Sequence, residues 1–308
     1  MTRSSSIVIC GLPESGKTTY LAALWHVLTV LTDEPCKLKL ASKKYDEYTY
    51  INKLHDAWLQ GHRQLRTRSS TEKIGLNLTL PSGGIIELIV PDVAGEDFKS
   101  LWSERHCTRD LAKSLQAREG LLLFINIDTL NKPRDATVAA KVHTRIGVAA
   151  TKAVQDSIEV DADRIPDENN TAMGSRPSFV ADDAADDTKL VDLLHTLARG
   201  ALRSPNRRIA IILSAWDLLA DDGRTPDVVL RDELPLLNGY LHKSDNGWET
   251  EVFGVSAQGG DFYDPDKEER SAEHEAVLAI PEQSRIRVVG NQVNSCDLTA
   301  PIAWVTTP

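Results

Sequence analysis

The chain has 308 residues, of which 41% are hydrophobic and 26% are charged, and its formal net charge is -10 at pH 7. This composition is typical of a folded globular protein, large enough for one α/β domain with insertions or for two modest domains. The negative charge argues against DNA or RNA as the main partner, because binding of a polyanion requires clustered Lys and Arg.

Cysteine spacing and apolar runs bear on the compartment. The four cysteines are scattered, with no CxxC pair and no spacing typical of metal ligands. The apolar run near the N-terminus is too short for a signal peptide, and no other run approaches the roughly 20 residues of a membrane span. We therefore expect reduced thiols, no membrane span and a cytoplasmic location.

The first part of the chain predicts a strand, a helix pair and a hairpin. Residues 6–10 form a β-branched run, and a Gly-rich turn separates them from an amphipathic helical pattern over 17–31. A second helical pattern covers residues 45–58. Strands are expected at 74–80 and 85–90, because the PSGG turn between them is a hairpin signal.

The later part alternates between helices and strands. One helix is expected over residues 97–116, and helical periodicity returns at residues 190–197. Apolar runs predict strands at 120–127, 208–214 and 251–256. Strands that alternate with helices predict an α/β fold, in which a mainly parallel sheet is covered by helices on both faces as a three-layer structure.

One stretch interrupts this alternation. Residues 155–187 contain ten acidic residues and two basic ones, with few aromatic residues. Such a composition cannot bury enough apolar surface to fold alone. We therefore interpret residues 131–187 as an acidic, flexible insertion within a single α/β domain that spans residues 1–308.

A phosphate-binding motif lies between the first strand and the first helix. Gly11, Gly16, Lys17 and Thr18 fit the pattern GxxxxGK[ST], in the strand–loop–helix context that the motif requires. Loop N–H groups and the helix N-terminus would face the phosphates, with Lys17 on the terminal pair and the Thr18 hydroxyl on Mg²⁺. The expected nucleotide contacts from this region are Gly11, Pro13, Glu14, Ser15, Gly16, Lys17, Thr18 and Thr19.

Later segments bear on the identity of the base and on the metal. Asp92 and Gly95 follow an apolar strand and resemble the DxxG motif of Ras-like GTPases. This resemblance implies that Asp92 holds Mg²⁺ through water and that the Gly95 N–H contacts the γ-phosphate.

Asp217 ends the run IAIILSAWD, where GTPases carry NKxD, although Ser214 and Ala215 replace the usual Asn and Lys. By this resemblance Asp217 accepts hydrogen bonds from guanine; the other interpretation is a strand end that caps the next helix. Ser256 and Ala257 resemble the final loop of the class, in which the Ala N–H contacts the base.

Hydrolysis in the class depends on a switch threonine, on a residue that positions water and on charge-stabilising residues. Thr71 is the best-placed switch threonine for Mg²⁺ and the γ-phosphate, with Thr67, Ser69 or Ser70, or a plain solvated loop, as alternatives. Glu96 stands where many GTPases have a water-positioning Gln, and its charge near the γ-phosphate predicts slow turnover. Lys17, Glu96 and Thr71 are the catalytic candidates. Arg105 and Arg109 are either charge-stabilising residues or solvated helix positions.

Taken together, the chain resembles the GTPase class of phosphate-loop proteins. The segments GLPESGKTTYLAALW, WLQGHRQLRT and DLTAPIAW look more narrowly like the bacterial double-GTPase families of conflict and signalling systems. The resemblance implies binding of GTP, GDP and Mg²⁺, a switch function with slow hydrolysis, and a protein effector or activator. A phosphate-loop ATPase or kinase, and a nucleotide-binding interaction module without turnover, are the alternatives.

The remaining conspicuous residues have a plainer interpretation. His26, His106 and His195 have no partners at metal-ligand spacing in the sequence. Trp25, Trp58 and the other helical tryptophan at 102 fall on apolar helix faces, so packing in the core is expected.

Overall fold

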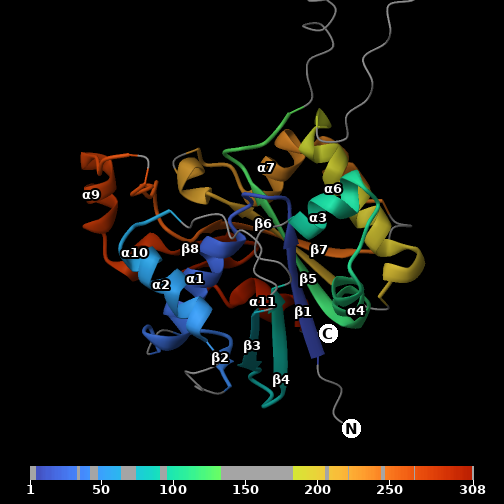
Figure 1. Cartoon of the computed structure of the whole chain (residues 1–308), viewed down its shortest axis with the longest axis horizontal. Coiled ribbons are helices and arrows are strands. Elements are labelled where there is room, and N and C mark those ends of the chain that lie inside the picture. Colours follow the sequence, from blue (N-terminus) through green and yellow to red (C-terminus); the bar gives the residue numbers. More distant parts are fainter. Residues whose placement is uncertain are drawn as a thin grey trace, which may run out of the picture.

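The computed structural model describes residues 5–32, 35–41, 48–63, 74–90, 96–132, 183–204, 208–220, 222–243, 247–266 and 268–306. Within these residues a nine-stranded sheet has the order β2-β3-β4-β1-β5-β6-β7-β8-β9 (Figure 1). The strands are β1 (Ser5–Gly11), β2 (Lys39–Leu40), β3 (Ile74–Thr79), β4 (Ile85–Val90), β5 (Arg118–Asn126), β6 (Arg208–Ser214), β7 (Glu249–Ser256), β8 (Arg287–Gly290) and β9 (Val293–Ser295).

The helices are distributed along the whole described chain. They are α1 (Lys17–Thr29), α2 (Thr49–Leu59), α3 (Glu96–Ser103), α4 (Arg109–Ala117), α6 (Asp186–Ala198), α7 (Pro226–Glu233), α8 (Pro235–Leu241), α9 (Ala272–Leu278), α10 (Glu282–Arg285) and α11 (Ala300–Thr306), with short 3₁₀ turns η3 (Gly200–Leu202) and η4 (Trp216–Leu219). Among the residues described here, no helix has the length and apolar character needed to cross a membrane.

The predicted parallel arrangement is confirmed for the central strands of the sheet. The outer strands on each side are antiparallel. Strands β4, β1, β5, β6 and β7 pair in parallel, so their carboxyl ends meet at one edge of the sheet. Strands β2 and β3 on one side, and β8 and β9 on the other, are antiparallel additions. The hairpin of β3 and β4 was expected; β2, β8 and β9 are too short to give a clear sequence signal.

Two hydrophobic clusters lie on opposite faces of the sheet. Ile7 and Ile9 belong to one cluster, while Val8 and Cys10 belong to the other, because successive strand residues point to opposite faces. Helices α1, α2 and α11 contribute to the first cluster, and α3, α4, α6, α7 and α8 contribute to the second. Figure 1 shows α1 and α2 on one side of the sheet and α3, α4 and α6 on the other.

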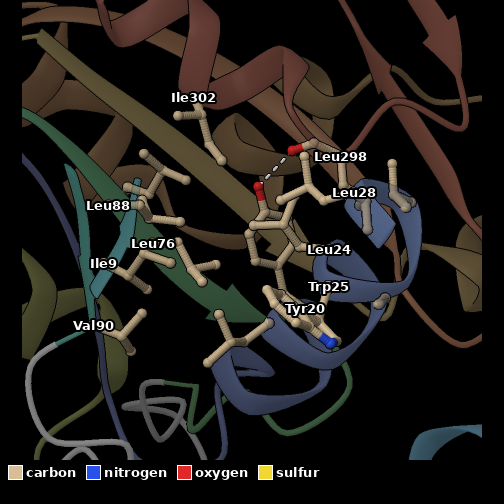
Figure 2. Packing of buried hydrophobic residues seen from close by; sticks show 14 of the residues in the cluster. Ile9, Tyr20, Leu24, Trp25, Leu28, Leu76, Leu88, Val90, Leu298 and Ile302 are labelled. Atoms are coloured by element: carbon tan, nitrogen blue, oxygen red, sulfur yellow. Dashed lines mark hydrogen bonds between the residues drawn. The ribbon is translucent and has the colours of Figure 1, made fainter. Parts of the chain in front are cut away.

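The C-terminal segment closes the first cluster. The hydroxyl of Tyr20 on α1 donates a 2.6 Å hydrogen bond to the Leu298 carbonyl, as Figure 2 shows. The Asp297 carboxylate accepts from the backbone N–H of Lys37, and the Thr299 hydroxyl accepts from that of Leu38. The residues of DLTAPIAW therefore join the end of the chain to the segment that follows α1.

The prediction of one continuous helix over residues 97–116 is wrong, because the structure has two helices there. Helix α3 ends at Ser103 and α4 begins at Arg109, because Arg105 adopts a left-handed backbone conformation with φ of 56°. The Arg105 guanidinium forms an ion pair with Asp192 of α6. This contact ties the turn between the two helices to α6.

The two ends of the predicted acidic insertion are joined to each other. Most of it, residues 133–182, lies outside the described residues, and its flexibility stays a prediction. The backbone N–H of Asn131 donates to the Asp186 carboxylate. The Asn131 carbonyl in turn accepts from the backbone N–H of Asp186. Helix α6 begins at Asp186, so the last residues of the expected insertion belong to this helix.

Asp187 connects α6 to α8. Its carboxylate is 1% exposed and accepts hydrogen bonds of 2.9 and 2.7 Å from the N–H groups of Leu236 and Leu237. These are N–H groups of the first turn of α8, which have no partner within the helix itself. A buried carboxylate from another helix therefore acts as the cap of α8.

We predict that Asp187→Ala lowers the free energy of unfolding by about 2 kcal/mol, because two buried N–H groups lose their acceptor. Urea denaturation measures this loss. The control is Asp110→Ala, which removes an exposed carboxylate from the first turn of α4 and should cost less than about 0.5 kcal/mol. Equal losses in the two variants would contradict the capping role.

Candidate functional site

The phosphate loop joins β1 to α1 with two glycines in conformations that favour glycine. Gly16 precedes α1 with φ of 84°, and Gly11 ends β1 with φ of 151°. A Cβ atom on Gly16 would lie 2.9 Å from the Ser214 hydroxyl oxygen, and one on Gly11 would lie 2.5 Å from the Phe124 carbonyl oxygen. Both the backbone angles and the close neighbours therefore require glycine at these positions.

Lys17 lies inside this loop and does not project into solvent. Its side chain is buried, with 3% of the residue exposed. The ammonium group donates hydrogen bonds to the carbonyls of Gly11 at 3.0 Å and Leu12 at 2.8 Å and to the Ser15 hydroxyl at 2.9 Å. A positive charge is thus held in the curve of the loop, next to the N-terminus of α1, where an anion is favoured.

Residues at the carboxyl ends of β5 and β6 form hydrogen bonds with the backbone of the phosphate loop. The Asn126 amide at the end of β5 donates to the Glu14 carbonyl at 3.1 Å, and the Ser214 hydroxyl at the end of β6 donates to the Ser15 carbonyl at 3.0 Å. Glu14 adopts a left-handed conformation with φ of 61°, which is unfavourable for a residue with a side chain. These two bonds therefore help to fix the shape of the loop.

Asn126 was not predicted from the sequence, and Ser214 was noted there only as a departure from NKxD. Each residue ends an apolar strand, and Asn126 pairs with Ser214 in the register of β5 and β6. Polar residues at the carboxyl ends of adjacent parallel strands are a signal that could have indicated both.

Asp217 lies in the turn η4 directly after β6. Ala215 before it has a left-handed backbone conformation with φ of 58°, which turns the chain at the strand end. Asp217 is half-buried, and within the described residues its carboxylate has no hydrogen-bond partner. The N-caps of η4 and α7 are Ala215 and Thr225, so Asp217 is the N-cap of neither, although it lies in the first turn of η4. Its contact with guanine stays a prediction.

Ser256 and Ala257 lie at the end of the next strand, where Ser214 pairs with Val255. The Ser256 hydroxyl donates to the Arg285 carbonyl at 3.2 Å and accepts from the Gly259 N–H at 3.1 Å. The Ala257 carbonyl accepts from the indole N–H of Trp58 at 2.9 Å. The phosphate loop, η4 and this loop thus follow the carboxyl ends of β1, β6 and β7 along one edge of the sheet.

Some predicted site residues fall outside these contacts. Thr71, Asp92 and Gly95 lie outside the described residues, and Glu96 is described only as the first residue of α3. Thr18 and Thr19 are in the first turn of α1 and are half-buried. In the part of the chain that the structure describes, no group of three His, Cys, Asp or Glu residues could hold a metal ion.

A hydroxyl at the start of a helix and a carboxylate reached from a neighbouring strand suit Mg²⁺, which keeps several waters and prefers oxygen ligands. Thr18, in the first turn of α1, provides such a hydroxyl. Strand β4, which precedes Asp92 in the sequence, ends at Val90 on the same edge of the sheet. The described residues are therefore compatible with a magnesium ion bound beside the phosphates.

His26 has a partner that the sequence did not indicate. Its Nδ1 lies 2.9 Å from Nε2 of His55 on α2, and both rings pack near Trp58. Burial lowers the pKa of His26 to about 4, and the positive charges of His55 and Arg285 act in the same direction. The Glu282 carboxylate opposes them by raising this pKa. Burial also lowers the pKa of His55. The pair is therefore neutral at pH 7, with one ring donating to the other.

This pair predicts acid sensitivity of the fold. The folded state binds the proton of His26 less tightly than the unfolded chain, whose pKa is 6.5, so stability is lost as the pH falls from about 6.5 to 4. One such histidine contributes a slope of at most about 1.4 kcal/mol per pH unit. Thermal denaturation of His26→Gln should show a shallower slope than the wild type, whereas exposed His106→Gln should not differ; equal slopes in all three proteins would refute this.

A strand, a glycine-rich loop and a helix N-terminus with an embedded lysine define the phosphate-loop class of nucleotide-binding proteins. The chain belongs to the Double-GTPase 1 family, whose family model matches residues 8–305. Membership of a GTPase family supports the binding of guanine nucleotide by this chain. No curated protein matches the sequence.

Solved structures that match this chain include bacterial selenocysteine-specific elongation factor EF-Sec, with a TM-score of 0.32 and 10% identity over 82% of this chain and 25% of that one. They also include the GTPase-like domain of S. cerevisiae Ski7 bound to GTP, with a TM-score of 0.37 and 12% identity over 90% of this chain and 49% of that one. The chain therefore spans less than half the length of either. At these scores and identities the likeness carries no conclusion about ligands or partners.

Proposed function

We propose that this protein is a GTP-binding switch that hydrolyses GTP slowly with Mg²⁺ and acts on a protein effector. The observation that carries the proposal is the phosphate loop, whose shape is fixed by Asn126 and Ser214 and whose centre holds the Lys17 ammonium. Membership of the Double-GTPase 1 family supports guanine as the base. A fixed loop binds triphosphate without first being ordered, which favours affinity.

The base is assigned to the loops after β6 and β7. In this proposal the Asp217 carboxylate accepts from the guanine N1 and N2 hydrogens, and the Ala257 N–H donates to the guanine oxygen. The carboxylate of Asp217 is half-buried and has no competing donor among the described residues. Adenine lacks the N1 hydrogen and the 2-amino group, so the same carboxylate discriminates against ATP.

Metal binding and hydrolysis are assigned to the other side of the loop. Thr18 directly, Asp92 through water, and Thr71 would hold Mg²⁺, which would neutralise charge on the phosphates, and Gly95 and Thr71 would contact the γ-phosphate. Glu96 acts on the attacking water. Its negative charge opposes that of the γ-phosphate, so turnover is slow unless a partner supplies a cation.

We predict that Lys17→Ala weakens GTP binding by about a hundredfold, which corresponds to the loss of about 3 kcal/mol from charge-assisted hydrogen bonds. Isothermal titration calorimetry measures the affinity. Because Lys17 also bonds to its own loop, circular dichroism must show that the variant is folded. Exposed Lys53→Ala on α2 is the matched control, and a folded Lys17→Ala with wild-type affinity would refute the phosphate site.

The base assignment predicts a change of specificity. Asp217→Asn replaces an acceptor by a group that also donates, so GTP binding should weaken by on the order of 1 to 3 kcal/mol. Xanthosine triphosphate, whose C2 carbonyl accepts a hydrogen bond, should bind better to the variant than to the wild type.

Equilibrium competition against a fluorescent GTP analogue measures both affinities, with Asp227→Asn on α7 as the control. A wild type that prefers ATP, or an Asp217→Asn variant with unchanged GTP affinity, would overturn the guanine assignment and leave the phosphate loop standing.

A further inference from the structure

We propose that Trp58 of α2 is a positioning residue for guanine recognition, because its indole holds the loop after β7 that carries Ala257. The inference rests on the proposed function, in which the Ala257 N–H contacts the base. Trp58 itself touches no substrate in this proposal. It acts through the backbone of the loop, and it lies 199 residues away from Ala257 in the sequence.

The indole of Trp58 is fully buried and contacts several neighbouring groups. The residue is 0% exposed, and its N–H donates to the Ala257 carbonyl at 2.9 Å. The ring centroid of His26 lies 5.1 Å from that of Trp58, and the Arg285 guanidinium carbon also lies 5.1 Å from the indole centroid. The indole therefore has little freedom to follow the loop, and the loop is held where the indole places it.

Ala257 is restrained on both sides of its Cα atom. The preceding residue, Ser256, is paired with Arg287 in the sheet, and its hydroxyl bonds to the Arg285 carbonyl. The carbonyl that follows the Cα atom is held by Trp58. The Ala257 N–H lies in the planar peptide unit shared with Ser256, and Trp58 holds the next peptide unit. Only the φ and ψ angles of Ala257 relate the two units, so anchoring both restricts the direction in which the Ala257 N–H points. A hydrogen bond to a base depends steeply on this direction.

A second set of contacts joins the end of α2 to the same loop. Tyr263 donates its backbone N–H to the Gly61 carbonyl at 3.1 Å and accepts from the Arg63 N–H at 2.8 Å. Its hydroxyl lies 2.9 Å from Nε2 of His62. The chain from Ala257 to Tyr263 is thus attached to the region of α2 at both of its ends. The bond to the Ala257 carbonyl distinguishes Trp58 from a tryptophan that only fills the core.

Trp25 provides the matched control. It is also buried, it lies on the adjacent helix α1, and its indole N–H donates to the Asn52 side chain at 2.9 Å. Trp25→Phe and Trp58→Phe each remove one indole hydrogen bond between buried helices or loops. Only Trp58→Phe removes a bond to the loop after β7 that carries Ala257. Comparison of the two variants therefore distinguishes an effect on the position of that loop from a general loss of stability.

The experiment measures the affinity of each variant for GTP and for magnesium tripolyphosphate, which has no base or ribose. We expect Trp58→Phe to bind GTP about three- to tenfold more weakly than the wild type, the loss of one buried hydrogen bond expressed through the loop. Its affinity for tripolyphosphate should be unchanged. Trp25→Phe should match the wild type with both ligands.

Each other outcome has a defined meaning. If Trp58→Phe binds GTP as well as Trp25→Phe does, or loses affinity for GTP and tripolyphosphate equally, the positioning role is overturned. If Trp58→Phe does not fold, replacement of Trp58 by benzothienylalanine, which keeps the bicyclic shape without the N–H, gives the same test. A wild type that binds ATP as tightly as GTP would instead refute the proposed function before any variant is compared.

Discussion

The contact between the phosphate loop and the ends of β5 and β6 is the constraint on which the rest of the site depends. Ser214 reaches the Ser15 carbonyl only because Gly16 has no side chain, since a Cβ there would lie 2.9 Å from the Ser214 hydroxyl. Asn126 makes the corresponding contact with Glu14. A loop fixed in this way places the Lys17 charge and the first N–H groups of α1 around one point, which is the requirement for binding phosphate.

The parallel core brings the remaining parts to this point. The carboxyl ends of β1, β6 and β7 lie on one edge, so a phosphate loop and two loops assigned to the base become neighbours although they are far apart in the chain. This is the edge at which open α/β sheets bind their ligands. The antiparallel strands β8 and β9 extend the sheet beyond β7, and Arg285, which precedes β8 in the chain, lies beside the loop after β7.

Helix α2 links the first half of the chain to the loop after β7. It packs on α1 through Trp25 and the His26–His55 pair, and it reaches Ala257 through Trp58. Helix α2 therefore contacts both the helix that follows the phosphate loop and the loop after β7, through different side chains. Packed side chains and buried hydrogen bonds leave each of these contacts little room for independent movement.

The sequence by itself determined the local features. The phosphate loop follows from glycine spacing, the hairpin of β3 and β4 from its turn, and β6 from an apolar run whose predicted bounds, 208–214, match the strand. Tertiary structure alone decided which side chains support the site. The bond from Asn126 to Glu14 spans 112 residues and that from Trp58 to Ala257 spans 199. Local periodicity reports which face of an element is buried, but the partner of a buried polar group is set by strand order and helix packing.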